Sequence, residues 1–129
     1  MKKMYWIILA VVILLAFVVM IFKGSEDDWI KDERGVWVKH GNPADTPSYV
    51  LEQQSAISCA LNLYEDFSVL TVEISSQCLG VCRGYAVDIV HVPRTSEDDL
   101  SENQCQAYRN GEAGHFIELD KEGNIVRIV

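Results

Sequence analysis

The chain has 129 residues, enough for one small domain, and a net charge of −8 at neutral pH. All nineteen acidic residues follow position 23, where only eight basic residues accompany them and leave a net charge of −11. Because such a surface repels phosphate groups, we expect no nucleic acid among the partners of this protein.

The first predicted element is a membrane anchor. The segment Met4–Phe22 contains nineteen residues without a charge, a glycine or a proline. As a helix it would be about 28 Å long, close to the roughly 30 Å of a bilayer's hydrocarbon core. Secretory signals have a shorter apolar region and small residues at the cleavage point, and no cysteine that could carry a lipid occurs before Cys59. We therefore expect an uncleaved anchor whose partner is the lipid bilayer.

Basic residues indicate how this anchor is oriented. Lys2 and Lys3 precede it together with the terminal amine, whereas Lys23 follows it and is succeeded by the acidic residues Glu26–Asp28. Since cytoplasmic flanks carry the excess of lysine and arginine, we expect the N-terminus in the cytoplasm and residues 24–129 outside. The predicted location is the cell membrane, with a single span and an extracytoplasmic C-terminal domain.

A short hairpin is predicted after the anchor. The runs Asp28–Lys31 and Val36–Lys39 flank a turn that ends at Gly35. Trp29 and Trp37 could pair across the two strands and form an aromatic binding patch. The simpler expectation is that both rings stabilise the hairpin, or that they lie near the membrane surface, which amphipathic rings favour.

A helix and two strands are predicted next. A threonine and a proline, suited to an N-cap and a first helical turn, precede the predicted helix Ser48–Asp66. Within it, apolar residues recur at helical spacing. Alternating apolar residues then predict strands over Val69–Ile74 and Tyr85–Val92, with a loop over Ser75–Gly84 between them.

The C-terminal part predicts a short helix and a closing hairpin. The segment Ser96–Tyr108 begins with an acidic turn, which suits the N-terminus of a helix. Strands are predicted over His115–Leu119 and Asn124–Val129, around the turn Asp120–Gly123, whose glycine can take a positive φ.

The predicted organisation has three parts: an anchor over residues 1–23, a linker with the tryptophan hairpin over 24–47, and a domain over 48–129. The expected fold class is α+β, in which an N-terminal transmembrane helix precedes a small antiparallel sheet packed against one helix. Such a domain can form only a modest core, which disulfides would reinforce.

Four cysteines, Cys59, Cys78, Cys82 and Cys105, all lie in the domain. An even number in a small extracytoplasmic domain predicts two disulfides, and a zinc site fits less well because only one close pair is present. Sequence alone permits three pairings. We favour Cys59–Cys105 with Cys78–Cys82, because the expected strand Val69–Ile74 carries Cys78 far beyond Cys59.

No motif predicts catalytic, cofactor-binding or metal-binding residues, and we expect no cofactor. His40, His91 and His115 lack the neighbours of a nucleophile–histidine–acid site and are expected on an edge or a solvent face. The acidic residues Glu97–Asp99 and Glu102 lack the spacing of a calcium-binding loop and fit the start of a helix.

Two stretches resemble known proteins. In layout, Ala60–Val129 resembles PepSY-like and cystatin-like folds, and Phe116–Val126 resembles the closing hairpin of PepSY-type domains. Separately, Trp29–Pro43 looks like a segment of uncharacterised small membrane-anchored proteins of archaea. The first resemblance implies a binding or inhibitory module outside the membrane.

The function expected from these features is non-enzymatic. We expect a membrane-tethered, acidic, disulfide-stabilised domain that interacts with an unknown protein partner. The alternative is a membrane-tethered thiol–disulfide oxidoreductase that uses Cys78 and Cys82, although redox motifs usually place two residues between their cysteines at a helix N-terminus.

Overall fold

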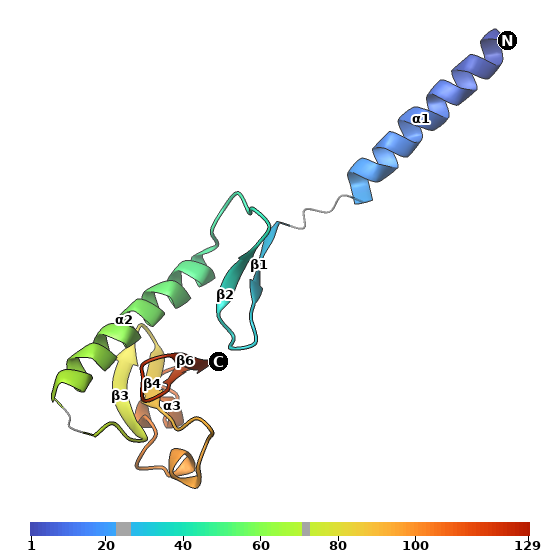
Figure 1. Cartoon of the computed structure of the whole chain (residues 1–129). Coiled ribbons are helices and arrows are strands. Elements are labelled where there is room, and N and C mark those ends of the chain that lie inside the picture. Colours follow the sequence, from blue (N-terminus) through green and yellow to red (C-terminus); the bar gives the residue numbers. More distant parts are fainter. Residues whose placement is uncertain (23–26, 71–72) are drawn as a thin grey trace.

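The computed structural model describes residues 1–22, 27–70 and 73–129 and has the expected α+β architecture (Figure 1). An N-terminal helix is followed by a hairpin, a long helix, and a four-stranded sheet with two short helices. The elements are α1 (Lys2–Phe22), β1 (Asp28–Lys31), β2 (Trp37–His40), α2 (Ser48–Leu70), β3 (Gln77–Cys82), β4 (Tyr85–Ile89), the 3₁₀ helix η1 (Ser96–Asp99), α3 (Gln106–Arg109), β5 (His115–Leu119) and β6 (Ile125–Ile128).

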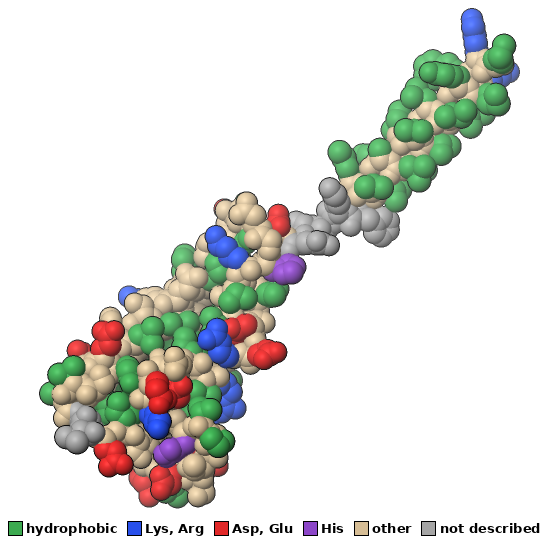
Figure 2. Space-filling view, in the orientation of Figure 1, with side chains coloured by type: hydrophobic (Ala, Val, Ile, Leu, Met, Phe, Trp, Pro, Cys, Tyr) green, Lys and Arg blue, Asp and Glu red, His purple; other side chains and the backbone are tan. Residues whose placement is uncertain are grey.

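The helix α1 is apolar on all sides, and Figure 2 shows hydrophobic side chains along its length. Within the part of the chain that the structure describes, Lys2–Met20 is the one helix long and apolar enough to cross a membrane, and none of it is buried. By length and composition, such a helix serves as a membrane anchor or as a signal sequence. Lys23 and Glu26, used above to orient it, lie outside the described residues.

The sheet has the strand order β3-β4-β5-β6 and is mixed, which corrects the expectation of a purely antiparallel sheet. β3 pairs antiparallel with β4, and β5 with β6, whereas β4 and β5 run parallel. Parallel neighbours need a crossover connection, and residues 90–114 supply it. This crossover segment contains η1 and α3 in place of the single helix that the sequence predicts over Ser96–Tyr108.

The strand predicted over Val69–Ile74 is wrong. α2 continues through its first two residues, residues 71–72 lie outside the described part, and residues 73–74 are irregular. The first strand of the sheet is β3, which lies inside the predicted loop. It forms a hairpin with β4 around Arg83 and Gly84, whose φ angles of 50° and 82° suit a two-residue turn.

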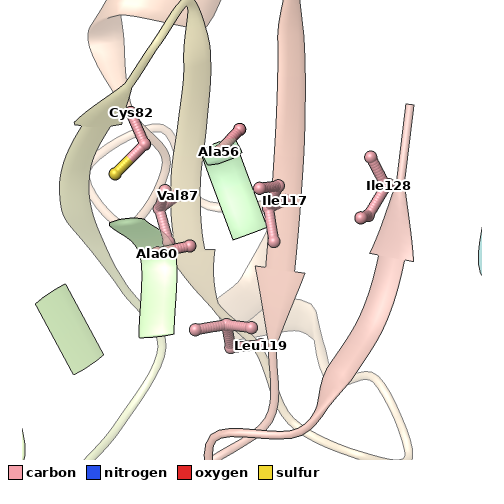
Figure 3. Packing of buried hydrophobic residues seen from close by; sticks show 7 residues of the cluster. All are labelled: Ala56, Ala60, Cys82, Val87, Ile117, Leu119 and Ile128. Atoms are coloured by element: carbon pink, nitrogen blue, oxygen red, sulfur yellow. The ribbon is translucent and has the colours of Figure 1, made fainter. Parts of the chain in front are cut away.

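One face of the sheet, here named the helix face, is covered by α2 (Figure 3). α2 turns Ala56 and Ala60 toward the strands, and both alanines are completely buried. Because these side chains are small, the helix can approach closely while the strands contribute the larger side chains of a close-packed core. The buried strand residues on this face are Cys82, Val87, Ile117, Leu119 and Ile128.

The hairpin β1–β2 is held on the domain by one buried glutamine. Gln53 of α2 accepts a hydrogen bond from the Trp37 backbone N–H (2.8 Å) and donates one to the Gly35 carbonyl (2.9 Å). At the edge of the sheet, the Ile128 N–H donates to the Arg34 carbonyl (2.7 Å). The hairpin, which falls within the predicted linker, therefore packs against the domain.

Each tryptophan of the hairpin stacks with a lysine and not with the other tryptophan. Trp29 lies opposite Lys39 and Trp37 opposite Lys31, and the ammonium groups are 5.7 and 5.2 Å from the ring centroids. The Trp29 indole N–H also donates to the Asp45 carbonyl (3.0 Å). Both rings thus stabilise the hairpin, which is the simpler of the two sequence-based expectations.

The turn Asp120–Gly123 is confirmed, and it provides the first test of the packing. Gly123 has a φ of 83°, and a Cβ added there would collide with the Tyr64 ring, whereas Gly84 has a φ of 82° with nothing within 4 Å of its Cβ position.

We expect Gly84→Ala to lower the free energy of unfolding by about 1 kcal/mol through backbone strain alone. Gly123→Ala should cost clearly more in denaturant unfolding of the full chain in detergent micelles. Equal losses would contradict a tight contact with Tyr64.

Candidate functional site

The opposite face of the sheet, here named the crossover face, lies beneath the crossover segment and carries a row of polar side chains. Cys78 lies opposite Asp88, Asp88 opposite Glu118, and Glu118 opposite Arg127, so each strand contributes one residue. Directly opposite side chains on one face of a sheet are within contact distance of each other. This polar row is the candidate functional site.

At one end of the polar row, a buried carboxylate is paired with two arginines. Glu118 accepts hydrogen bonds from the guanidinium groups of Arg94 (2.8 Å) and Arg127 (3.0 Å). Arg94 also pairs with Asp99 (3.0 Å), and Arg127 lies over the Phe116 ring, 5.0 Å from its centroid. Because Glu118 has two charged donors, its burial is compensated at this end of the row.

A second buried carboxylate organises the start of the crossover segment. Asp98 accepts hydrogen bonds from the backbone N–H groups of Thr95 (2.7 Å) and His91 (3.0 Å) and contacts His91 Nδ1 (3.0 Å). Burial alone would raise the pKa of Asp98, but these hydrogen bonds outweigh it and lower that pKa to about 2. Asp98 is thus ionised, and its hydrogen bonds hold the loop that follows β4.

His91 does not form a nucleophile–histidine–acid relay, although a hydroxyl and a carboxylate both reach it. Thr95 Oγ1 lies 3.2 Å from Nδ1, the same ring nitrogen that Asp98 contacts. Such a relay needs the hydroxyl and a hydrogen-bonded acid on different ring nitrogens, and the carboxylate on the Nε2 side, that of Glu97, is 4.0 Å away, beyond hydrogen-bond distance. The structure therefore gives His91 a role in positioning the loop. His40 and His115 are exposed, as the sequence predicts.

Asp88 lies in the middle of the polar row, and no cationic side chain among the described residues donates a hydrogen bond to it. Its carboxylate accepts the Cys105 backbone N–H (2.9 Å). Burial raises the pKa of Asp88 to about 6, and the negative charge of Glu118 adds to the rise, while the Cys105 N–H and Arg94 partly offset it. This carboxyl group therefore changes its charge just below neutral pH.

A cavity of about 110 Å³ lies between the polar row and the crossover segment. Binding sites for drug-sized ligands usually measure about 300–1,000 Å³, so this cavity suits a few waters or a short side chain better than a cofactor. The groups that line it are charged or polar for the most part, and they include Asp88, Arg94, Asp98, Tyr108, Glu118 and Arg127.

All four cysteines form disulfides, as the sequence predicts, but the favoured pairing is wrong. The bonds are Cys59–Cys82, with a Cα–Cα distance of 5.8 Å, and Cys78–Cys105, with a Cα–Cα distance of 4.8 Å. Cys78 and Cys82 belong to one extended strand, where residues four apart are about 13 Å apart and cannot be bridged. The proposed redox pair of Cys78 and Cys82 is therefore wrong as well.

A β-bulge directs the two cysteines of β3 to different partners. The register with β4 shifts between Cys78 and Gly80, and Gly80 has a φ of 148°. Without this extra residue, positions four apart would share one face of the sheet. With it, Cys82 lies on the helix face and bonds Cys59 of α2, whereas Cys78 lies on the crossover face and bonds Cys105.

The acidic and sulfur-containing groups that could bind a metal ion are engaged in other interactions. Cys78, Asp88 and Cys105 bring ligand atoms within 4.8 Å of one another, but the two sulfurs form a disulfide and offer no thiolate. Of the acidic residues near the start of the predicted helix, Asp98 is bound by His91, and Asp99 pairs with Arg94.

Sequence reasoning missed the charged members of the polar row. Asp88 and Glu118 are single acidic residues inside otherwise apolar strands, Tyr85–Ile89 and His115–Leu119, and they occupy the same position in the parallel register. A lone carboxylate in a buried strand is a signal that was available, because such groups are rarely buried without a partner.

No protein-family model, no curated protein and no solved structure matches this chain. The resemblance of Ala60–Val129 to PepSY-like and cystatin-like folds, and that of Trp29–Pro43 to archaeal membrane-anchored proteins, therefore stay predictions. Any function has to be argued from the geometry of this chain.

The observed pairing predicts that the two disulfides contribute similarly to stability. They join residues separated by 23 and 27 positions, so the chain-entropy relation gives each about 3–4 kcal/mol. We expect the double variants Cys59→Ala/Cys82→Ala and Cys78→Ala/Cys105→Ala to lose comparable unfolding free energy in denaturant titrations. Non-reducing peptide mapping tests the pairing itself, and a peptide that links Cys59 to Cys105 would contradict it.

The raised pKa of Asp88 predicts a pH-dependent stability. Its folded value of about 6 lies above the usual 3.8, so its ionisation destabilises the fold as the pH rises through 6. Asp88→Asn keeps an oxygen for the Cys105 N–H and cannot ionise. We expect it to raise the unfolding free energy at pH 8 by about 1–2 kcal/mol, allowing for solvent screening, and to change little at pH 4. Asp66→Asn, on the exposed side of α2, is the control and should change little at either pH.

Proposed function

We propose that this protein is a single-span membrane protein whose N-terminus lies in the cytoplasm and whose acidic, disulfide-stabilised domain binds a protein partner outside the membrane. The observation that carries the proposal is the combination of an apolar helix with no buried residues and a domain in which every cysteine is paired. Disulfides persist in oxidising, extracytoplasmic compartments, and an apolar helix of this length is suited to a bilayer.

The distance between helix and domain limits where the partner can lie. Asp28, the first residue of the hairpin, follows Phe22 by six residues, which span at most about 20 Å. The domain is therefore tethered close to the bilayer surface, where it would meet other membrane proteins or their extracytoplasmic domains.

The site chemistry favours binding over catalysis. The ring of His91 has the carboxylate of Asp98 and the Thr95 hydroxyl on one nitrogen. Glu97 is 4.0 Å from the other nitrogen, too far for the hydrogen bond that a relay needs.

The cavity of about 110 Å³ beneath the crossover segment is too small for a drug-sized substrate, whereas a neighbouring surface pocket of about 430 Å³ carries Arg94, Glu118 and Arg127 and is large enough for a ligand. The net charge of −11 after position 23 favours a basic surface on the partner and disfavours nucleic acid.

Protease treatment of intact cells that express a C-terminally tagged chain tests this proposal. We expect the tag to be removed while a cytoplasmic reference protein survives, and the α1 fragment to stay in the membrane during a carbonate wash. A tag that is protected in intact cells, or a chain that carbonate releases, would contradict the topology.

A matched pair of charge variants tests the predicted cause of the orientation. Lys2→Gln/Lys3→Gln removes the positive charge before the anchor and should lower the fraction of chains that protease digests. Lys31→Gln/Lys39→Gln removes the same charge from the hairpin, beyond the anchor, and should not lower that fraction. Equal effects of the two variants would show that the N-terminal lysines do not set the orientation.

A further inference from the structure

The two disulfides lie in different surroundings. In Cys59–Cys82, the Cys82 residue is 1% exposed and belongs to the core between α2 and the sheet. In Cys78–Cys105, Cys105 is equally buried, but Cys78 is exposed on β3, which is an edge strand of the sheet. Both disulfides join a buried cysteine to a more accessible one, but Cys59 is partly buried against the core, whereas Cys78 is exposed.

The second disulfide also has a carboxyl group beside it. Asp88 lies opposite Cys78, and a carboxylate oxygen of Asp88 and both sulfurs lie within 4.8 Å of one another. The Sγ of Cys105 is 3.3 Å from the Gly80 carbonyl oxygen and 3.4 Å from that of Val87. A thiol at Cys105 would therefore have a proton source beside it and two acceptors for its S–H.

We propose that Cys78–Cys105 is a thiol–disulfide exchange site that accepts electrons from a dithiol of a partner protein, while Cys59–Cys82 is structural. A thiolate of the partner attacks the exposed Cys78 Sγ, forms a mixed disulfide, and displaces Cys105 as the leaving group. The electron pair of the broken S–S bond stays on Cys105 Sγ, which takes a proton from Asp88.

The second thiolate of the partner then completes the exchange. This thiolate attacks the partner's other sulfur, which is bonded to Cys78 in the mixed disulfide. Cys78 is released as a thiolate and takes a proton from solvent. The partner dithiol is oxidised by two electrons to a disulfide, and Cys78–Cys105 is reduced to two thiols. This activity goes beyond the proposed binding function and can be measured on purified protein, so its failure would leave the topology untouched.

The charged and titratable groups around Asp88 determine when it can donate this proton. They come from four directions: β5, β6, the loop that precedes η1 together with η1, and α3. These groups are Glu118, Arg127, Arg94, Asp98 and Tyr108. The nearest influences oppose each other, because Glu118 favours the protonated form of Asp88 and Arg94 favours the ionised form.

The first test compares the two disulfides within one molecule. The full chain in detergent micelles is exposed to dithiothreitol, and each disulfide is quantified by differential alkylation and peptide mapping. We expect Cys78–Cys105 to be reduced at least about tenfold faster, with Cys59–Cys82 intact, circular dichroism unchanged, and the same pairing restored on reoxidation. Equal rates, earlier loss of Cys59–Cys82, or unfolding on reduction of Cys78–Cys105 would overturn the proposal.

The second test separates a functional Asp88 from simple exposure of Cys78. The rate of Cys78–Cys105 reduction is measured at several pH values between 5 and 7.5, around the Asp88 pKa of about 6. Each rate is divided by the concentration of dithiothreitol thiolate at that pH, which removes the pH dependence of the reductant. For the unmodified chain we expect this quotient to fall by about tenfold as the pH rises, because the acid form donates the proton. Asp88→Asn should give a flat, low quotient, and the control Asp66→Asn should keep the slope. The same slope in Asp88→Asn would overturn the role of Asp88.

Discussion

The β-bulge in β3 determines how both faces of the sheet are held. It turns Cys78 and Cys82 to opposite faces, although residues four apart in a regular strand share one face. One disulfide then fixes α2 to the helix face, and the other fixes the crossover segment to the crossover face. In a small domain with a modest core, a covalent connection to each layer compensates for limited apolar burial.

The fixed crossover segment creates the environment of the polar row. Because this segment connects parallel strands, it passes over the centre of the sheet and brings Arg94 onto Glu118. Asp98 holds the beginning of the segment through backbone N–H groups, and the Cys78–Cys105 disulfide holds its middle. Carboxylates that would be exposed on an open sheet are thereby removed from water, and each one needs compensation from a neighbour.

Sequence reasoning recovered the elements whose signals are local. The apolar N-terminal helix, the tryptophan hairpin and the closing turn at Gly123 depend on runs, spacing and turn residues within a few positions. It failed where contacts between distant residues decide the structure. The apolar residues at Val69–Ile74 resemble a strand, yet α2 extends into them. This error misplaced the later cysteines relative to Cys59, and the predicted pairing was wrong as a result. The parallel pairing of β4 with β5 left no local signal, so neither the disulfide pairing nor the polar row could be assembled from the chain alone.

The two carboxylates at the centre of the polar row differ in a way that separates structure from function. Glu118 has two guanidinium donors, so its charge is compensated and contributes to the fold. Asp88 receives one backbone N–H, which an asparagine could satisfy equally well, and its ionised form lowers the stability of the fold at neutral pH. A titratable group held where it costs folding free energy is typical of functional sites. Asp88 is such a group, and it lies beside the disulfide whose Cys78 residue is exposed.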